Sequence, residues 1–315
     1  MNVLLFTHRS DIDGMGEAIL SKLAFDNVTY ELCETFDINN RILSYIDNNK
    51  IYDYDMVYVT DLCPSEEVVE KVISNDKIKG KFKVFDHHKT FYNVYKDKYP
   101  FIKIKISNDK GLCCGTSLFY EYLVNEKLLE ERNDVAEFVE LTRQHDTWEW
   151  KNIYNNEKSH ELALLFDSIG QEGYIKLIYD KLLNKKESFE YDDFEKMLIE
   201  NKKKISLETL KNYASKIVIK EVYGLKAGIL FIDYQYRSDL AEYLRSINYD
   251  VDFIMMMAMD HDSISFRSIK DGINVRKVAE SFGGKGHDVA AACPIYGDTK
   301  EEIINIILKR RNNNE

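Results

Sequence analysis

Short apolar runs alternate with helical periodicity over the first half of the chain. Three strand-length runs of branched and aromatic residues stand at Val3–Thr7, Met56–Thr60 and Phe82–Phe85. Apolar residues between these runs recur every three to four positions, as they do on one face of a helix. This alternation predicts βαβ units and a parallel sheet.

The second half of the chain has a different pattern. Charged residues dominate 185–215, which we interpret as a helical linker, and compact β-type runs with two helical patterns follow it. We therefore expect an α/β protein with a parallel-sheet domain over 1–184 and a smaller α/β domain over 216–315. A chain of 315 residues, 44% of them hydrophobic, is long enough to form two cores.

Composition limits the classes of partner and the location. The net charge of −11 disfavours long duplex nucleic acid, which usually binds a basic face, but leaves short anionic substrates open. The five cysteines are odd in number and show no C-x-x-C spacing, which favours reduced thiols and a cytoplasmic location. No apolar run approaches the ~20 residues that cross a bilayer, so we expect no membrane partner. A homodimer is left open.

Acids and imidazoles follow all three apolar runs, and one more acid follows a helical pattern. These side chains are His8, Asp11, Asp13, Asp61, Asp86, His87 and Asp146. The carboxyl ends of parallel strands meet at the ligand-binding edge of a sheet, and five unpaired carboxylates there would repel one another. Divalent cations resolve this repulsion. The oxygen and imidazole donors suit Mn²⁺, with Mg²⁺ or Co²⁺ possible, and two ions ~3.5–4 Å apart would share a bridging carboxylate.

Each feature taken alone has a simpler structural explanation. Asp11 and Asp13 stand before Gly14, where a plain turn also favours such residues. Arg267 is as compatible with a surface salt bridge as with a ligand, and His261 is most simply exposed or structural. The agreement of three strand ends favours a site over these separate explanations.

The triplet Asp86-His87-His88 is the signature after which the DHH phosphoesterases are named, and the chain resembles this family over nearly its whole length. The opening His8–Gly14, the strand end at Asp61 and the acid Asp146 stand in the family's order. So does the run 283–287, Gly-Gly-Lys-Gly-His, which resembles the loop of a DHH-associated domain. The small residues after it, 288–292, fit the helix expected there.

The resemblance implies a role for each residue at the sheet edge. One metal ion would be held by His8, Asp11 and Asp61. The other would be held by Asp13, Asp61, His87 and Asp146, so that Asp61 bridges the two ions and the nucleophile is a water or hydroxide shared by them.

The resemblance also assigns roles outside the metal ligands. Asp86 would not bind metal but would orient the ring of His87. His88 would act on the phosphate as a hydrogen-bond donor or acid. In the second domain, a glycine loop at a helix start would form an anion nest. The substrate-binding residues would be Arg267, Gly283, Gly284, Lys285, Gly286 and His287.

The leading hypothesis is a Mn²⁺-dependent phosphodiesterase similar to the nano-RNase (oligoribonuclease) branch, releasing nucleoside monophosphates from short oligonucleotides or dinucleotides. A site shared by two domains would limit substrate length. Hydrolysis of cyclic dinucleotides or of their linear products is the nearest alternative. A pyrophosphatase of the sister branch is disfavoured by the glycine loop, and a sensor without catalysis is disfavoured because every expected position is filled.

Overall fold

The computed structural model describes residues 1–312. Two compact units divide the chain, the first spanning Met1–Lys202 and the second beginning at Lys203. This division lies within the stretch 185–215 that the sequence suggests as a linker. Within the described residues, no helix combines the length and the apolar character that a membrane span requires.

The first unit is built on a five-stranded sheet in the order β2-β1-β3-β4-β5, and all neighbouring strands are parallel. Val3 and Leu5 of β1 pack into one core, while Leu4 and Phe6 pack into the core on the opposite face. Because successive side chains of a strand point to opposite faces, a fully apolar run fits a sheet covered on both sides. The strands are β1 (Asn2–His8), β2 (Asn27–Cys33), β3 (Met56–Thr60), β4 (Phe82–Asp86) and β5 (Ile102–Ile104).

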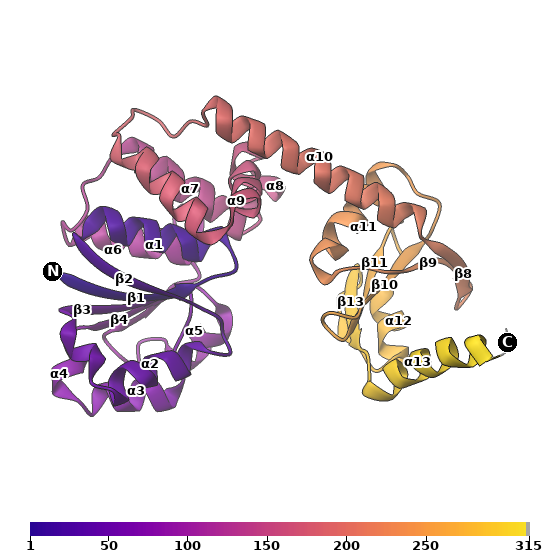
Figure 1. Ribbon diagram of the computed structural model, residues 1–315, viewed down its shortest axis with the longest axis horizontal. Coiled ribbons are helices and arrows are strands. Elements are labelled where there is room, and N and C mark those ends of the chain that lie inside the picture. Colours follow the sequence, from indigo (N-terminus) through magenta and orange to yellow (C-terminus); the bar gives the residue numbers. More distant parts are fainter. Residues whose placement is uncertain (313–315) are drawn as a thin grey trace. The chain divides into compact units, whose positions relative to one another are not determined.

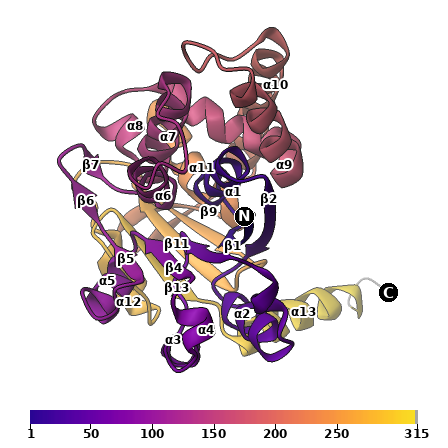
Figure 2. The same cartoon turned by 90° about the vertical axis from the view of Figure 1, so that its left-hand side faces the viewer.

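Helices cover both faces of this sheet (Figure 1). One face carries α1 (Ile12–Ala24), α6 (Gly115–Asn125), α7 (Asn133–Asp146) and α9 (Glu157–Leu183). The other carries α2 (Ile38–Asp47), α3 (Glu66–Ile73), α4 (Asp76–Lys79) and α5 (Lys89–Tyr95). The remaining elements are the 3-10 helix η1 (Lys50–Asp53), the short helix α8 (Glu149–Asn152) and the hairpin β6 (Ser107–Asn108) and β7 (Gly111–Leu112), which forms a sheet of its own (Figure 2).

The second unit holds a six-stranded mixed sheet in the order β12-β13-β11-β10-β9-β8. Only β9 and β10 pair in parallel within it; the other pairs are antiparallel. Its strands are β8 (Val218–Val222), β9 (Leu225–Phe231), β10 (Phe253–Ala258), β11 (Ser263–Ser268), β12 (Lys285–Gly286) and β13 (Ala290–Pro294). Its other elements are η2 (Tyr234–Tyr236), α11 (Arg237–Ser246), α12 (Val275–Ser281) and α13 (Gly297–Asn312).

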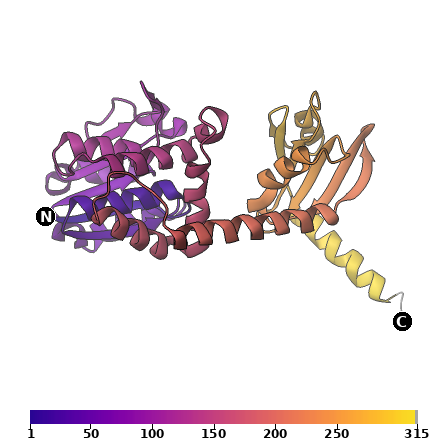
Figure 3. The same cartoon turned by 90° about the horizontal axis from the view of Figure 1, so that it is seen from above.

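The expected fold class is confirmed: an α/β chain with a parallel N-terminal sheet and a smaller second α/β unit. The charged stretch 185–215 contains α10 (Asp193–Ser215), and the division between the two units falls within this helix (Figure 3). One expectation is wrong. The small residues of 288–292 do not form a helix. Residues 290–292 belong to β13, in which Ala291 is buried and pairs with Phe266 of β11. Consequently the glycine run follows the end of α12 and does not open a helix.

Candidate metal centre

The carboxyl ends of β1, β3 and β4 lie side by side. Thr60 of β3 pairs with Thr7 of β1 and with Phe85 of β4. The residues that follow these three positions are His8, Asp61 and Asp86. Their side chains therefore leave the sheet at one edge, which is the edge where open α/β sheets bind ligands.

One group of side chains gathers around His8. Its Nδ1 lies 2.7 Å from Asp11 Oδ2 and 3.5 Å from Asp61 Oδ2. Asp11 reaches this position as the N-cap of α1, where its other oxygen accepts from the backbone N–H of Gly14 at 3.1 Å. Only glycine fits at position 14, since a Cβ there would lie 1.9 Å from the carbonyl oxygen of His8.

A second group gathers around His87. Its Nε2 lies 3.1 Å from Asp61 Oδ1, 3.6 Å from Asp146 Oδ2 and 3.8 Å from Asp13 Oδ2. Asp13 belongs to the first turn of α1, and Asp146 is the last residue of α7. Helix ends and strand ends thus meet at one place.

Asp61 belongs to both groups, because its two carboxylate oxygens face different imidazoles. Its side chain is 3% exposed, and its backbone adopts a left-handed φ of 53°. A non-glycine residue with a left-handed backbone is strained, and such strained residues cluster at functional sites. Burial would raise the pKa of Asp61, but hydrogen bonds from His8 and His87 lower it to about 2, so the carboxylate is ionised.

Burial and charge oppose each other in the rest of the cluster. Burial would lower the pKa of His87, but the carboxylates around it raise that pKa to about 10. Burial raises the pKa of Asp13 to about 6, and the neighbouring Asp61 adds to this effect. The side chain of Asp146 is 21% exposed, and partial burial together with the neighbouring Asp13 raises its pKa well above the usual range. Ionisation of these acids therefore costs free energy, and bound cations would remove this cost.

The donor set fits divalent cations. Ligand atoms of His8, Asp11 and Asp61 all lie within 4.8 Å of one another, and so do those of Asp13, His87 and Asp146. Carboxylate oxygens with imidazole nitrogens are donors that Mn²⁺ and similar ions accept, whereas thiolates are absent from both groups. The six residues predicted as metal ligands are therefore brought together. Asp61 belongs to the group of His8 and Asp11 and also to a third group with Asp86, His87 and His88, and not to the group of Asp13, His87 and Asp146. The assignment of each residue to one ion stays a prediction.

Comparison with known proteins decides the family. No family model matches the chain. Oligoribonuclease NrnB of Bacillus subtilis strain 168 is 30% identical to it over 302 residues, which are 95% of this chain and 74% of that protein. The chain belongs to the DHH phosphoesterase family. It is accordingly a metal-dependent phosphoesterase.

Solved structures share its fold. The pGpG-specific phosphodiesterase PggH of Vibrio cholerae is 16% identical, with a TM-score of 0.52 and 100% of both chains covered. Exonuclease RecJ bound to manganese is 13% identical, with a TM-score of 0.52 over 94% of this chain and 86% of that chain. The DHH domain of a member of the s1p family of ribosomal proteins is 14% identical, with a TM-score of 0.57 over 98% and 86%. These likenesses show a common DHH architecture.

Within the DHH triplet, Asp86 contacts a different imidazole from the one expected. Its Oδ1 accepts from the backbone N–H groups of His87 and His88, at 2.7 and 3.1 Å, and lies 2.8 Å from Nδ1 of the His88 ring. The Asp86 carboxylate therefore orients His88 and not the ring of His87. The reason is local: an aspartate that binds the N–H two residues ahead forms a turn that brings the second ring back to it.

Two backbone donors complete the surroundings of Asp13. The N–H groups of Gly115 and Thr116, at the start of α6, donate to its two oxygens at 2.7 and 2.8 Å. Gly115 and Thr116 are small residues that can open a helix, but no side-chain motif in the sequence marks these two donors or the buried Glu17 below the site. Glu17 Oε2 accepts from Thr7, and burial raises the pKa of Glu17 well above its usual range.

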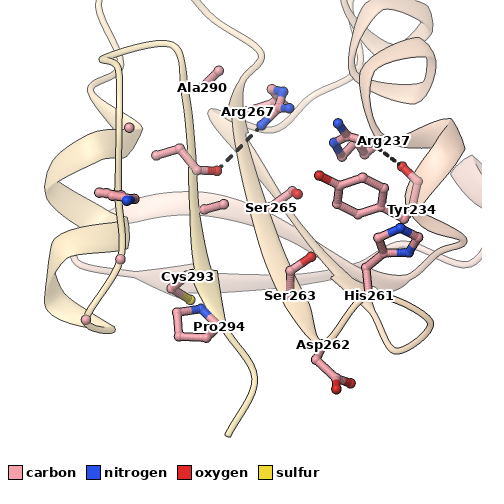
Figure 4. Close-up of a pocket in the computed structure, with 16 residues that line it drawn as sticks. Tyr234, Arg237, His261, Asp262, Ser263, Ser265, Arg267, Ala290, Cys293 and Pro294 are labelled. Atoms are coloured by element: carbon pink, nitrogen blue, oxygen red, sulfur yellow. Dashed lines mark hydrogen bonds between the residues drawn. The ribbon is translucent and has the colours of Figure 1, made fainter. Parts of the chain in front are cut away.

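Most of the predicted substrate-binding residues share a pocket in the second unit (Figure 4). Arg267 lies on one wall, on β11, and the run Gly283, Gly284, Lys285 and Gly286 lies on another. His287 is exposed and does not line this pocket. The sequence missed three further lining residues, Tyr234, Arg237 and His261, because they come from segments far apart in the chain.

Proposed function

We propose that this DHH phosphoesterase hydrolyses the phosphodiester bonds of short oligonucleotides, dinucleotides included, and releases nucleoside monophosphates. One observation carries the proposal: Asp61 Oδ1 lies 3.1 Å from His87 while Asp61 Oδ2 lies 3.5 Å from His8. A carboxylate shared in this way suits a pair of cations better than a single one. The name of the relative NrnB supports short oligoribonucleotides as the substrate class.

Two cations, Mn²⁺ by preference and Mg²⁺ or Co²⁺ otherwise, would supply an activated water and neutralise phosphoryl charge when bound. In this proposal His8, Asp11 and Asp61 hold one cation. Asp13, Asp61, His87 and Asp146 hold the other. The raised pKa values of Asp13 and Asp146 support this assignment, because these two acids gain most from the added positive charge.

His88 would donate a proton or hydrogen bond to the substrate phosphate. Its side chain is 51% exposed, and Asp86 Oδ1 engages its Nδ1, which leaves Nε2 free to face a ligand. The hydrogen bond to Asp86 raises the pKa of His88, so the protonated, donating form is favoured. Asp86 acts here as a positioning residue.

The second unit would hold the substrate's phosphate. Two kinds of group are assigned to this role. They are the side chains of Arg267, Lys285 and His287 and the backbone of Gly283, Gly284 and Gly286. Guanidinium groups and glycine backbones that allow close approach are both common in phosphate sites.

The proposal includes a cytoplasmic location. All five cysteines are buried and free, which supports reduced thiols.

A substrate panel tests the proposal. The full-length chain is stripped of metal and assayed with Mn²⁺, Mg²⁺ or Co²⁺ on linear dinucleotides, trinucleotides, longer oligomers, a cyclic dinucleotide and pyrophosphate. We expect Mn²⁺ to restore the highest rate, on linear dinucleotides or trinucleotides, with nucleoside monophosphates as products.

The same panel separates the alternatives. A preference for the cyclic dinucleotide or for pyrophosphate would replace the proposed substrate, and rates that rise with oligomer length would contradict a short substrate. Binding of nucleotides without turnover under any metal would indicate a sensor.

A further inference from the structure

A buried ion pair lies outside the candidate metal centre, near the end of α7. Nη1 of Arg143 donates to Oε2 of Glu149 at 2.5 Å, and the two side chains are 3% and 7% exposed. Arg143 belongs to the last turn of α7, and Glu149 is the first residue of α8. Desolvation of the two charges offsets most of their attraction, so such a pair adds little net stability. It is better suited to fixing a geometry, and we call it the clamp.

The clamp holds the backbone of one residue from two directions. Nη1 of Arg143 also donates to the carbonyl oxygen of Leu112 at 2.8 Å, and Oε1 of Glu149 accepts from the N–H of Leu112 at 3.1 Å. Hydrogen bonds to charged groups are shorter and stronger than those between neutral groups. Leu112, which belongs to β7, is therefore fixed to the end of α7 and the start of α8.

The surroundings of the clamp give it a single arrangement. Nε and Nη2 of Arg143 donate to the carboxylate of Glu140 at 2.8 and 2.7 Å, which fixes the plane of the guanidinium. Gly111 has a φ of 132°, which side chains rarely adopt. A Cβ there would lie 2.9 and 3.0 Å from the carboxylate oxygens of Glu149. Glycine at this position therefore lets the chain approach the clamp.

The arginine end of the clamp is connected to Asp146. Asp146 is the last residue of α7 and lies three residues after Arg143. The carbonyl oxygen of Arg143 accepts from the backbone N–H and the hydroxyl of Thr147, at 3.1 and 2.8 Å. These bonds close the final turn of the helix around Asp146. The orientation of Arg143 therefore bears on the position of the Asp146 carboxylate.

The other end of the clamp is connected to Asp13. Leu112 lies two residues before Cys114, which is the N-cap of α6. The next two N–H groups, those of Gly115 and Thr116, are the donors to Asp13 described above. The two residues between Leu112 and these donors are both buried. Because a close-packed interior transmits a displacement, a shift of Leu112 would move the donors of Asp13.

Both connections lead to the same imidazole. The Oδ2 atoms of Asp13 and Asp146 lie 3.8 and 3.6 Å from Nε2 of His87. We propose that the clamp sets the spacing between Asp13 and Asp146. It thereby sets the affinity of the cation that these two acids and His87 hold. This inference rests on the two cations of the proposed function. Arg143 and Glu149 are positioning residues, because they act through the two acids.

Manganese binding to the full-length chain, stripped of metal and without substrate, tests this inference. Free Mn²⁺ is followed by electron paramagnetic resonance. The double variant Arg143→Met/Glu149→Met removes both charges, so neither stays buried without its partner and the fold should persist. One of the two Mn²⁺ ions should bind roughly 10- to 100-fold more weakly, as when outer partners of metal ligands are removed. The other ion should bind as in the wild type.

Two further measurements distinguish positioning from a general loss of structure. Excess Mn²⁺ should restore kcat of the double variant on a dinucleotide, which it would not do for a misfolded chain. Glu149→Gln keeps an oxygen that can accept from Leu112 but loses the charge. It should weaken the same Mn²⁺ ion, by a smaller factor.

Lys181→Met/Glu195→Met is the matched control. Lys181 of α9 and Glu195 of α10 form another buried ion pair of the first unit, 2.5 Å apart, with side chains 8% and 0% exposed. This variant should bind both Mn²⁺ ions as the wild type does. Wild-type affinity for both ions in Arg143→Met/Glu149→Met would overturn the inference. Equal weakening of both ions, or the same selective loss in the control, would overturn it as well.

Hydrolysis of a dinucleotide measured in parallel separates the two claims. Selective loss of one Mn²⁺ ion in the clamp variant, with no hydrolysis by the wild type, would refute the proposed function alone. Hydrolysis by the wild type, with Mn²⁺ binding unchanged in the clamp variant, would refute the role of the clamp alone.

Discussion

The candidate metal centre of the first unit and the pocket of the second unit differ in the charge of their side chains. Aspartates outnumber imidazoles at the sheet edge, whereas the described residues that line the pocket include the cations Arg237, Arg267 and Lys285 and one carboxylate, Asp262. A net charge of −11 describes neither site. In the proposed function, the two sites would bind an anionic substrate differently, the first through acids that hold cations and the second through arginines beside the phosphate.

The two sites also differ in how the chain builds them. The acids and imidazoles of the first unit stand where parallel strands and helices end, so a regular fold aligns them. The pocket of the second unit is lined by Tyr234 of η2 and Arg237 of α11 and by His261 of the turn between β10 and β11, and Asp260 contacts both Tyr234 and His261. Sites of the first kind follow from element pattern, whereas sites of the second kind depend on tertiary contacts between loops.

Asp61→Asn should break the metal centre while the second unit stays intact. The asparagine amide keeps the shape of the aspartate but loses its negative charge. Both proposed cation sites would then lose the carboxylate that they share. We expect kcat on a dinucleotide to fall by more than the ~10²–10³-fold that loss of one oxyanion-hole donor costs other enzymes. Nucleotide binding by calorimetry should change far less.

Asp47→Asn is the control for this prediction. Asp47 is a 59% exposed aspartate of the same unit whose Oδ1 pairs with Lys71 at 2.8 Å. This variant should keep full activity, because a surface ion pair contributes little. Activity retained in Asp61→Asn would show that Asp61 does not bridge two cations.

Arg267→Ala should weaken substrate binding at the second site, whereas Asp61→Asn mainly lowers kcat. Loss of a charge-assisted contact of ~1.5–3 kcal/mol would raise KM by roughly 10- to 150-fold, with a smaller change in kcat. Arg276→Ala is the control, because Arg276 of α12 is 46% exposed and pairs with Asp288 at 3.2 Å outside the pocket. A loss confined to kcat in Arg267→Ala would mean that Arg267 acts on the chemistry, and the contrast between the two sites would fail.

Residue pattern was sufficient for the parallel sheet, for the second α/β unit and for the acids at the strand ends. It was insufficient wherever the decisive contact is made by backbone. Residues 290–292 form part of β13, in which Ala291 pairs with Phe266 of another strand, and local propensity does not report such a pairing. In the same way, the N–H groups of Gly115 and Thr116 bind Asp13 across about a hundred residues of chain. No side-chain motif marks such donors.

Gly115→Ala tests the role of these backbone donors, and its expected effect is the smallest of the three variants. A Cβ at position 115 would lie 2.3 Å from Glu17 Oε1 and 2.8 Å from Asp61 Cβ, so the start of α6 must shift. Overpacking of this kind costs ~1–3 kcal/mol, which thermal unfolding would detect. A displaced α6 would also loosen the hydrogen bonds to Asp13, so a higher Mn²⁺ concentration should be needed for half-maximal activity. Gly80→Ala is the matched control, since a Cβ there meets nothing within 4 Å. If both variants need the same Mn²⁺ concentration, the backbone of α6 does not position Asp13 for metal binding.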